Sequence, residues 1–471
     1  MPRFHYFVLL LGLAWAANIT NVVAAEPAAK ARPNIIFILA DDLGWTDVGC
    51  MGSKYYETPA IDRLAREGMK LTSYYNCQNC APTRAALMSG QYAPRTGIYT
   101  VGTLESGQAR FRKMDVPVNQ TRLPLDRVTV AQALKDAGYR TAMFGKWHLG
   151  QNGDYHPSRR GFEEAIVSMG RHFDFQTNPK VDVPPGAYLA DFLTDHAVRF
   201  IEKNKDRPFF LYLPHFGVHG PHQAKKELIA KYEKKKPAGG HHSPIYAAMI
   251  DSVDQSVGRI LSKLDELKLA DNTIVIFSSD NGGVGGYEAA GVKARAITDN
   301  APLRGGKGML YEGGVRTPFV VRWPGVVRPG SVCDEPAIHV DLFPTFIEMA
   351  GGKKPSQPLD GVSLSPLLKD PGAKLSREAI YMHFPGYLEG NGPGAWRTTP
   401  VGVIRSGDFK LLEFYEDGRI ELYNVKEDIA EKKDVAKKMP EKTNELRRKL
   451  AAWRESIHAA MPRLKKDEGG K

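Results

Sequence analysis

Cysteine, long apolar runs and internal repeats are all scarce in this 471-residue sequence. Its 4 cysteines are too few for a disulfide scaffold of this length. The 46 glycines and 32 prolines follow no period, which excludes collagen-like and low-complexity architectures. Beyond the N-terminal region, no stretch approaches the roughly 18 apolar residues of a membrane-spanning helix. With 42% hydrophobic and 25% charged residues, the chain is expected to be globular and to have no transmembrane segment.

Acidic residues are in the minority. The chain has 64 Lys and Arg against 53 Asp and Glu, a formal net charge of +11. Lysine runs of the kind found on solvated surfaces explain at least half of this excess. The remainder favours an anionic partner. We expect no nucleic acid among the partners.

The first 25 residues have the pattern of a secretory signal peptide. Arg3 precedes an apolar run from Phe7 to Ala17, and the small-residue sequence VAA precedes Glu26. The apolar run is too short to cross a bilayer comfortably. We therefore expect residues 1–25 to be removed and the mature protein to be soluble and exported, either periplasmic or secreted.

Apolar runs and helical patterns alternate through residues 26–375, the larger predicted domain. Continuous apolar runs suit strands that are buried on both faces of a parallel sheet. Their alternation with helices predicts an α/β fold, a large mostly parallel or mixed sheet sandwiched by helices. Ligands of such sheets bind beyond the carboxyl ends of the strands. The expected strands are 34–40, 139–144, 208–213, 273–279 and 318–323, and the expected helices are 60–70, 129–137, 189–205, 245–267 and 340–350.

The pattern changes after about residue 375. Strand-like segments are joined by a turn and followed by a charged amphipathic helix. Residues 376–471 are therefore predicted to form a small C-terminal subdomain, an antiparallel sheet with a helix, that covers the main sheet and shapes one rim of the cleft. The expected strands are 402–407, 409–415 and 420–424, and the expected helix is 440–458.

Oxygen-bearing side chains follow two of the buried strands directly. Asp41 and Asp42 come after the first strand, and Asp280 and Asn281 after the strand 273–279. Three carboxylates would repel one another unless a cation bridged them, and carboxylate and amide oxygens suit a hard ion such as Ca²⁺ or Mg²⁺. Turn formation after a strand is the alternative explanation.

A cysteine begins the next motif, Cys80-Ala-Pro-Thr-Arg84. Pro82 suits the first turn of a helix, so Cys80 is expected at or near its N-cap, where backbone N–H groups stabilise an anion. Arg84 shares a face with Cys80, and its planar fork suits a tetrahedral oxyanion. A buried thiol and a surface charge are the alternatives.

The other cysteines leave several pairings open. Cys77 and Cys80 form a C-x-x-C, which is compatible with a redox pair or a disulfide in an exported protein. Cys50 and Cys333 are interpreted as buried thiols or as a bridge.

Basic and titratable residues follow two further strands. If the extended conformation continues, Lys146 and His148 point to the same side beyond the strand 139–144, as a catalytic pair would. His215, His219 and His222 follow the strand 208–213; one or two are expected to act, and a zinc site is the alternative.

A glycine-rich loop contains the last candidate. Lys307 lies within Gly305–Gly308, where glycine lets the backbone approach a ligand closely. The alternative is a flexible loop.

Together, these motifs resemble the formylglycine-dependent sulfatases of the alkaline-phosphatase-like superfamily. The family's nucleophile motif, C-x-P-S-R, is similar to Cys80–Arg84, in which Thr83 replaces the usual Ser. Gln91 replaces an Arg that is common after the motif. The resemblance spans about residues 33–425 and includes five motifs in the family's order.

The resemblance implies a role for each candidate. Cys80 would be oxidised to formylglycine (3-oxoalanine) by a formylglycine-generating enzyme, and then hydrated to a geminal diol. His219 is preferred among the three histidines because the family places His before x-Pro. The implied ligands of one Ca²⁺ ion are Asp41, Asp42, residue 80, Asp280 and Asn281, and the implied contacts of the sulfate and the diol are Arg84, Lys146, Lys307, His219 and, for the diol, His148.

The implied activity is hydrolysis of a sulfate ester. One diol hydroxyl would attack sulfur while His219 or Lys307 protonates the leaving alcohol. His148 would take a proton from the second hydroxyl, so that the aldehyde re-forms and sulfate leaves. Calcium and the basic side chains would offset the negative charge of the sulfate oxygens.

The substrate is encoded less clearly. The segment 168–175 is rich in polar and aromatic residues and could contact a sugar, with Arg171 and His172 as candidates. Export, basic charge and sulfatase chemistry point to a sulfated polysaccharide or oligosaccharide. The rival hypotheses are a phosphoester or phosphonate ester hydrolase of the same superfamily, a non-catalytic protein that binds sulfated glycans, and a thiol–disulfide oxidoreductase.

Overall fold

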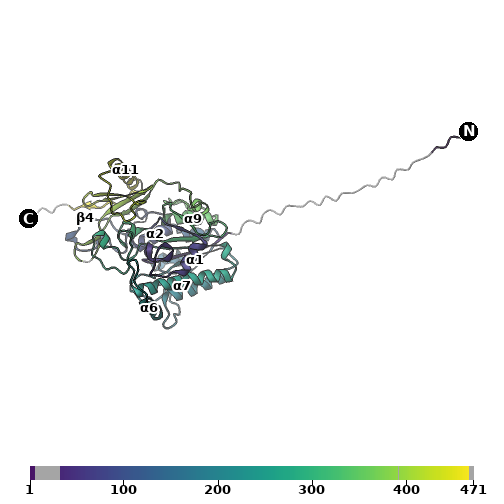
Figure 1. Ribbon diagram of the computed structural model, residues 1–471, viewed down its shortest axis with the longest axis horizontal. Coiled ribbons are helices and arrows are strands. Elements are labelled where there is room, and N and C mark those ends of the chain that lie inside the picture. The colour runs from purple at the N-terminus through teal and green to yellow at the C-terminus, as the bar shows by residue number, and fades with distance from the viewer. Residues whose placement is uncertain (6–31, 391, 466–471) are drawn as a thin grey trace, which may run out of the picture. The chain divides into compact units, whose positions relative to one another are not determined.

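A mixed eight-stranded β-sheet forms the centre of the unit Arg32–Lys471 (Figure 1). The computed structural model describes residues 1–5, 32–390 and 392–465, so most of the predicted signal peptide lies outside the described residues. None of the helices in these ranges is long and apolar enough to cross a membrane.

The strand order places the first strand in the middle of the sheet. β1 pairs in parallel with both β7 and β8, and Ala40 at its end lies opposite Ser279. β9 runs antiparallel to β8 and β2, which makes the sheet mixed, as expected. In spatial order the strands are β10 (Ser331–Cys333), β2 (Met69–Leu71), β9 (Phe319–Arg322), β8 (Thr273–Ser279), β1 (Asn34–Ala40), β7 (Phe209–Pro214), β5 (Arg140–Gly145) and β6 (Glu164–Val167).

Helices cover both faces of this sheet, so the predicted sandwich is confirmed. Successive side chains of β1 point to opposite faces, and Phe37 and Ile38 accordingly belong to different hydrophobic cores. The core around Phe37 includes α2 (Cys80–Ser89), α4 (Val130–Asp136), α9 (Leu342–Ala350) and α10 (Ser365–Lys369). The core around Ile38 includes α1 (Pro59–Glu67), α5 (Leu189–Lys203), α6 (Lys226–Glu233) and α7 (Pro244–Glu266).

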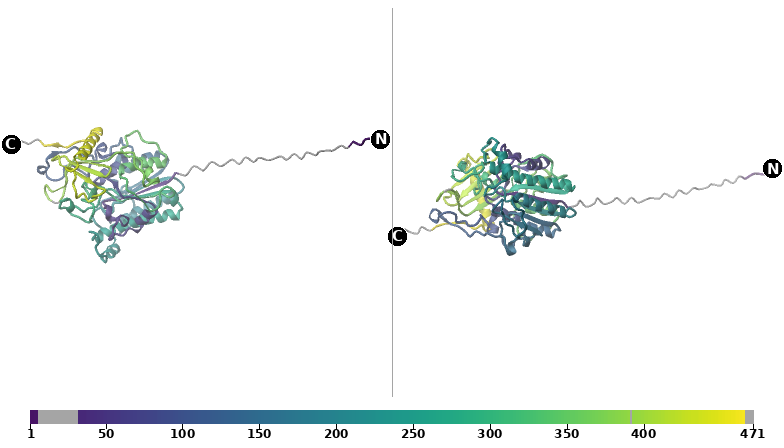
Figure 2. Two further views of the ribbon diagram at one scale, coloured as in Figure 1. Left: turned by 45° about the horizontal axis from the view of Figure 1, so that its top comes forward. Right: turned by 90° about the horizontal axis from the view of Figure 1, so that it is seen from below.

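A second, antiparallel sheet follows in the sequence and lies to one side of the first, in yellow-green in Figure 2. Leu446 and Leu450 of its helix pack on Leu411 and Leu422. The expected antiparallel sheet with a helix is confirmed, and one strand that the pattern did not indicate, β12, is added. In spatial order the strands are β12 (Ile380–Phe384), β15 (Val401–Ser406), β16 (Phe409–Phe414) and β17 (Ile420–Asn424), and the helix α11 (Pro440–Ser456) packs against β15 and β16.

Two details concern boundaries. The helix expected at 60–70 ends at Glu67, and Gly68, with φ −136° and ψ −142°, is no longer helical. An added Cβ at Gly68 would lie 2.1 Å from the Val321 carbonyl oxygen, so no side chain fits there. The chain then enters β2. The domain boundary between residues 375 and 376 stays a prediction. The remaining short elements are β3 (Tyr74–Tyr75), α3 (Ala93–Thr96), β4 (Met114–Asp115), α8 (Glu312–Val315), β11 (Ala337–Ile338), β13 (Leu388–Glu389), β14 (Trp396–Thr398) and β18 (Arg463–Leu464).

Candidate active site

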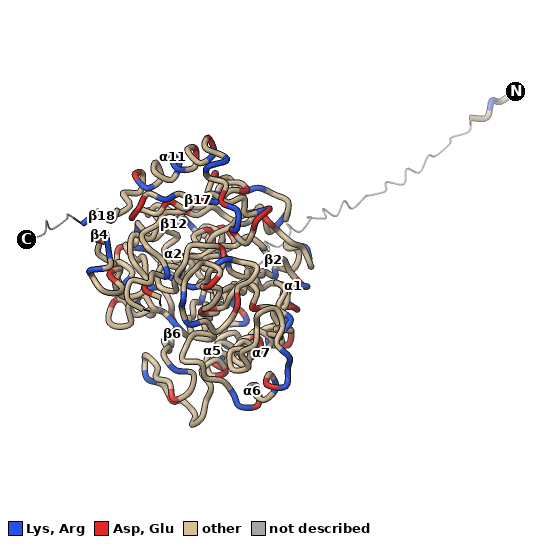
Figure 3. Tube along the Cα trace, turned by 60° about the vertical axis from the view of Figure 1, so that its left-hand side comes forward, with Lys and Arg blue, Asp and Glu red and all other residues tan. Residues whose placement is uncertain are grey.

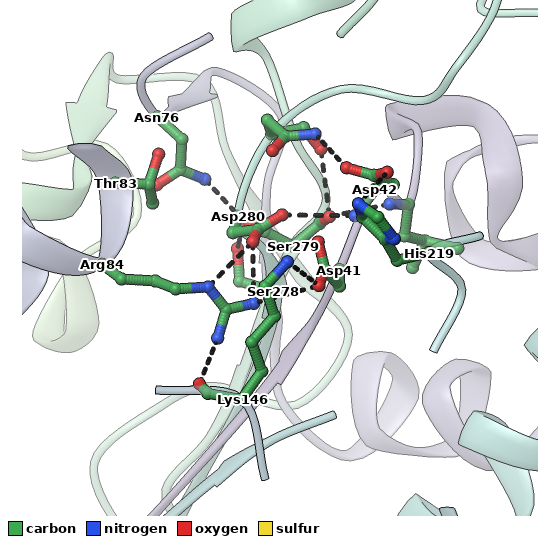
Figure 4. A network of polar contacts seen from close by, with 12 residues as sticks. Asp41, Asp42, Asn76, Thr83, Arg84, Lys146, His219, Ser278, Ser279 and Asp280 are labelled. Carbon is green, nitrogen blue, oxygen red and sulfur yellow. Dashed lines mark hydrogen bonds and ion pairs between the residues drawn. The ribbon is translucent and has the colours of Figure 1, made fainter. Parts of the chain in front are cut away.

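The ends of β1 and β8 bring the predicted oxygen ligands together (Figure 4). The backbone N–H of Asp280 donates to the Ala40 carbonyl at 3.1 Å, and the N–H of Asp42 donates to Asp280 Oδ1 at 3.2 Å. Asp41, Asp42, Asp280 and Asn281 are all at most 2% exposed. Residues that are 239 positions apart in the sequence therefore form one buried acidic cluster, because two parallel strands end at the same edge.

Three basic side chains neutralise the three carboxylates. Arg84 Nε and Nη2 donate to Asp280 Oδ2 at 3.0 and 2.7 Å, and Lys307 Nζ donates to Asp42 Oδ2 at 2.7 Å. Lys146 Nζ donates to Asp41 Oδ2. These six residues, Asp41, Asp42, Arg84, Lys146, Asp280 and Lys307, are called the catalytic cluster below.

The pKa values of the carboxylates diverge within this cluster. Burial alone would raise the pKa of Asp41, but Lys146, His219 and Arg84 hold it well below its usual range. Asp42 also has a lowered pKa, since Lys307 and His219 outweigh its burial. Burial and the neighbouring Asp41 raise the pKa of Asp280 to about 7. Asp280 is thus the carboxylate of the three whose charged form is least stabilised by its surroundings.

Cys80 is the first residue of α2 and is 1% exposed. Its Sγ lies within 4.8 Å of one carboxylate oxygen each of Asp41 and Asp280, and these two oxygens lie within 4.8 Å of each other. Burial raises the pKa of the Cys80 thiol, although Lys146 and Lys307 act in the opposite direction. At neutral pH the side chain is therefore a protonated thiol, which is a weaker nucleophile than a thiolate.

Unpartnered oxygens show that the acidic cluster could hold a metal ion. Asp41 Oδ1 and Asn281 Oδ1 are buried and have no hydrogen-bond partner in the described part of the chain. Asn281 Nδ2 donates to Asp42 Oδ1 at 2.9 Å, which leaves the amide oxygen as a free acceptor. Carboxylate and amide oxygens are the ligands that hard divalent cations prefer, so the donor set fits such an ion.

Two histidines border the cluster. His219 Nδ1–H donates to the Gly220 carbonyl at 2.6 Å, so its Nε2, 3.7 Å from Asp42 Oδ2, is the atom that can accept or deliver a proton. Burial and the nearby Lys146 lower the pKa of His148 to about 3, and its Nδ1 makes no hydrogen bond within the described ranges.

The backbone from Gly145 to His148 does not continue the extended conformation on which the predicted pairing of Lys146 and His148 depended. β5 ends at Gly145, whose φ is +134°, and His148 has a φ of +62°. An added Cβ at Gly145 would lie 1.9 Å from the Pro214 carbonyl oxygen, so a side chain is excluded there. A bend, and not alternation along a strand, brings Lys146 and His148 to the cluster.

Comparison with known proteins identifies the family of this chain. The family model "Sulfatase" matches residues 33–352, well over half of the chain. The chain belongs to the sulfatase family. A second model, "N-sulphoglucosamine sulphohydrolase, C-terminal", matches residues 306–456. The expected enzyme class, sulfuric ester hydrolase, and the alkaline-phosphatase-like fold are thereby confirmed.

Individual relatives cover most of this sulfatase. A sulfatase of Formosa agariphila is 35% identical over 508 aligned positions, which cover 90% of this chain and 89% of that protein. The N-acetylgalactosamine-6-sulfatase of Canis lupus familiaris is 33% identical, over 80% and 72% of the two chains. The crystal structure of Ps i-CgsB in complex with k-i-k-neocarrahexaose is 32% identical, with a TM-score of 0.75 over 90% and 92% of the two chains.

The other predicted histidines and Arg171 lie outside the cluster of this sulfatase. His215 is fully buried and its Nε2 bonds to Ser256 Oγ at 2.9 Å, which indicates a structural role. His172 Nε2–H donates to the His219 carbonyl at 2.8 Å, and its ring stacks on Phe216. Arg171 is exposed. A direct contact of His172 or Arg171 with substrate stays a prediction.

The four cysteines are free in the structure. Cys77 Sγ lies 3.5 Å from His339 Nε2, and burial raises the pKa of the Cys77 thiol to about 12. The structure thus joins none of Cys50, Cys77, Cys80 and Cys333 in a disulfide.

One supporting residue was missed by sequence reasoning. Asn76 Nδ2 donates to the Ser279 carbonyl and to Thr317 Oγ1, each at 2.7 Å, and so ties the segment before Cys80 to the end of β8. A single asparagine in an irregular segment carries no periodic signal; only its place near the Cys80 motif could have indicated it.

A second group of buried charges links the active-site loops to the C-terminal sheet. Lys410 on β16 contacts Glu312 Oε1 and Glu431 Oε1, both at 2.9 Å. Glu312 Oε2 accepts from Tyr75 Oη at 2.9 Å and from Arg316 Nη1 at 3.1 Å. The four charged residues, Glu312, Arg316, Lys410 and Glu431, are called the support cluster below. Glu312 begins α8, and the Gly314 carbonyl in α8 accepts from the Gly282 N–H at 3.0 Å, directly after Asn281.

Proposed function

We propose that this sulfatase hydrolyses sulfate esters of a sulfated polysaccharide or oligosaccharide, with formylglycine made from Cys80 and one Ca²⁺ ion. The observation that carries the proposal is the position of Cys80, buried at the start of α2 with its ligand atom within 4.8 Å of those of Asp41 and Asp280. The relatives named above include one structure with a bound neocarrahexaose and one enzyme named for a sulfated amino sugar. These names favour a carbohydrate substrate.

Asp41, Asp42, Asp280, Asn281 and residue 80 would hold the calcium ion. Its charge would reduce the electron density on the sulfate oxygens and so favour attack at sulfur. The unpartnered Asp41 Oδ1 and Asn281 Oδ1 support this assignment, because both are oxygen donors without a partner among the described residues.

The chain's own side chains divide the remaining work. Arg84 and Lys146 orient the sulfate and stabilise the charge that develops on its oxygens. Lys307 or His219 Nε2 protonates the leaving oxygen, since both lie at Asp42 on the same side of the cluster. His148, which burial keeps neutral, accepts the proton of the second hydroxyl at residue 80, so that sulfate can leave. Formylglycine, when present and hydrated, supplies a second hydroxyl, so that sulfate can leave without a separate attack by water.

The predicted domains take different parts in this proposal. The proposed nucleophile, ion ligands and proton-transfer groups all lie between Asp41 and Lys307, within the catalytic domain 26–375. Residues 376–471 stabilise the loops of that domain through the support cluster. We further propose that residues 1–25 direct export to the periplasm or beyond, and that a formylglycine-generating enzyme is the maturation partner.

Mass spectrometry of one tryptic peptide tests the nucleophile. Trypsin releases residues 71–84, which contain both Cys77 and Cys80. We expect this peptide to be about 18 Da lighter than the unmodified form, with fragment ions that locate the change at residue 80. Fully active protein with an unmodified Cys80 would overturn the proposal.

Activity measurements complete the test. Cys80→Ala should lower sulfate release from a sulfated oligosaccharide by about 10³-fold or more while the protein still folds. Cys77→Ala is the matched control and should stay within about threefold of the wild type. Faster release of phosphate from a phosphate ester than of sulfate from the matched sulfate ester would favour the phosphohydrolase alternative. Binding without any release would favour a lectin-like protein.

A further inference from the structure

Acidic and basic residues are interspersed along the trace of the described chain (Figure 3), and most buried cations have acidic partners. Arg397 on β14 is different. In residues 32–390 and 392–465 it forms no ion pair and no side-chain hydrogen bond, and its Nε is buried without a partner. Arg397 is half-buried, so its guanidinium is partly removed from water without a paired carboxylate in these residues. A guanidinium in this state can bind an added anion.

Arg397 lies next to the loop that carries Lys307. Its Cζ is 5.0 Å from the centroid of the Tyr287 ring, and the Tyr287 hydroxyl donates to the Lys307 carbonyl at 3.1 Å. A Cβ built on Gly308 would lie 2.7 Å from Arg397 Cδ. The contact is therefore at the residue directly after Lys307, whose Nζ is bonded to Asp42 in the catalytic cluster.

The hairpin that carries Arg397 is held by the segment around Ser106. The Glu389 N–H of β13 donates to Ser106 Oγ at 3.0 Å, and Tyr387 forms a β-bridge with Glu105. Arg397 and Trp396 also line a cavity of about 150 Å³ together with Met309. The backbone of Arg397 is thus anchored, while its guanidinium is left without a charged partner.

We propose that Arg397 forms a subsite for a second anionic group, a sulfate ester or a carboxylate, on the carbohydrate whose sulfate ester is cleaved. The inference rests on the proposed function for the identity of the substrate. The planar guanidinium can donate two parallel hydrogen bonds to either kind of oxyanion. The ring of Tyr287 beneath it limits its orientation. The C-terminal subdomain would in this way select substrates that carry more than one negative charge.

Three defined sugars test the proposal: N-acetylgalactosamine 6-sulfate, its 4,6-disulfate, and the uronate-containing chondroitin 6-sulfate disaccharide. Arg397→Ala should lower kcat/KM for a doubly charged sugar by about 10- to 100-fold more than for the monosulfate, mainly through KM. Arg397→Lys keeps the charge without the planar fork, so its kcat/KM for a doubly charged sugar should lie between those of the wild type and Arg397→Ala. A selective loss on the disulfate or on the uronate identifies which anion is recognised.

Arg419→Ala is the matched control. Arg419 lines the same cavity, but it is paired with Glu421 and stacks on Phe414. Its replacement removes the same charge and should leave the ratio of kcat/KM values between the sugars unchanged. An equal change in that ratio for both variants would mean a general electrostatic effect and would overturn the subsite.

Binding measurements separate this inference from the proposed function. Calorimetric titrations of the three sugars use Cys80→Ala and the double variant Cys80→Ala/Arg397→Ala. A selective loss of affinity for the doubly charged sugars supports the subsite, even if the wild type releases no sulfate and the proposed function fails. Equal affinities in the two variants, or no binding of any of the sugars to either, overturns it.

Discussion

The catalytic cluster and the support cluster are both buried and both balance their formal charges, three against three and two against two. They differ in whether the side-chain oxygens have partners. Both carboxylate oxygens of Glu312 are bound by cations or a hydroxyl. In the catalytic cluster, Asp41 Oδ1 and the adjoining Asn281 Oδ1 have no partner among the described residues. In the support cluster, Glu431 Oε1 also makes no hydrogen bond within the described ranges, but it lies 2.9 Å from Lys410 Nζ, whereas the ion pairs of Asp41 are made by its other oxygen, Oδ2. Charge balance alone therefore does not separate the two clusters; what differs is whether an oxygen without a hydrogen bond still contacts a cation.

The largest effect that sharpens this comparison is expected at Asp280. Asp280→Asn removes a charge from the catalytic cluster and a proposed ion ligand, so kcat/KM for a sulfate ester should fall by about 10³-fold. In the wild type, Ca²⁺ at about 100 times its Kd should raise Tm by about 3 °C, because the ion binds only the folded state. This gain should disappear in Asp280→Asn.

Lys410→Met is the control for calcium binding, since it alters the other cluster. The variant should keep the full calcium-dependent rise in Tm. A rise that is lost in Lys410→Met, or retained in Asp280→Asn, would contradict the assignment of the ion to the catalytic cluster.

The next effect is on stability and concerns the support cluster. Lys410→Met leaves Glu312 and Glu431 buried without their shared cation, and should lower the free energy of unfolding by about 3–5 kcal/mol in urea titrations. The kcat/KM of the folded protein should fall by less than about tenfold. Lys449→Met, which removes ion pairs at the surface, should cost at most about 1 kcal/mol. Equal losses for the two lysines would show that burial does not set the difference.

The smallest effect is a pH dependence. Burial raises the pKa of Glu431 to about 7, above the value of an unfolded glutamate, so the folded state binds the extra proton and loses stability as pH rises toward 7. Without Lys410 the pKa of Glu431 should rise further. The free energy of unfolding of Lys410→Met should then keep falling between pH 7 and 8.5, by about 1–2 kcal/mol, while that of the wild type levels off. Parallel curves for the two proteins would contradict this role of Lys410.

Local sequence predicted the strand ends that build the site. β1 and β8 are buried along their whole length and stop directly before Asp41 and Asp280, so their bounds and a mostly parallel sheet followed from the pattern. Their direct pairing is a finding of the structure. The three-residue strand β2 is too short to show a period, so its first two residues were predicted as the end of the preceding amphipathic helix.

Contacts between distant residues could not be predicted in this way. Lys410 and Glu312 are 98 positions apart, and no motif links them. Arg397 is an ordinary surface residue by its sequence, and only the folded hairpin brings it to Gly308. The close approach of Gly145 to Pro214 on the neighbouring strand, after which the chain bends toward His148, likewise has no local sequence signal.

The burial of Cys80 limits when its proposed conversion can take place. Only 1% of this residue is exposed once α2 has packed beneath the ends of β1 and β8. An enzyme that oxidises the thiol would have to bind several residues of this segment in an unfolded conformation. If Cys80 is converted as we propose, the modifying enzyme would therefore have to act on the nascent or unfolded chain, and a molecule that folds first would keep its thiol.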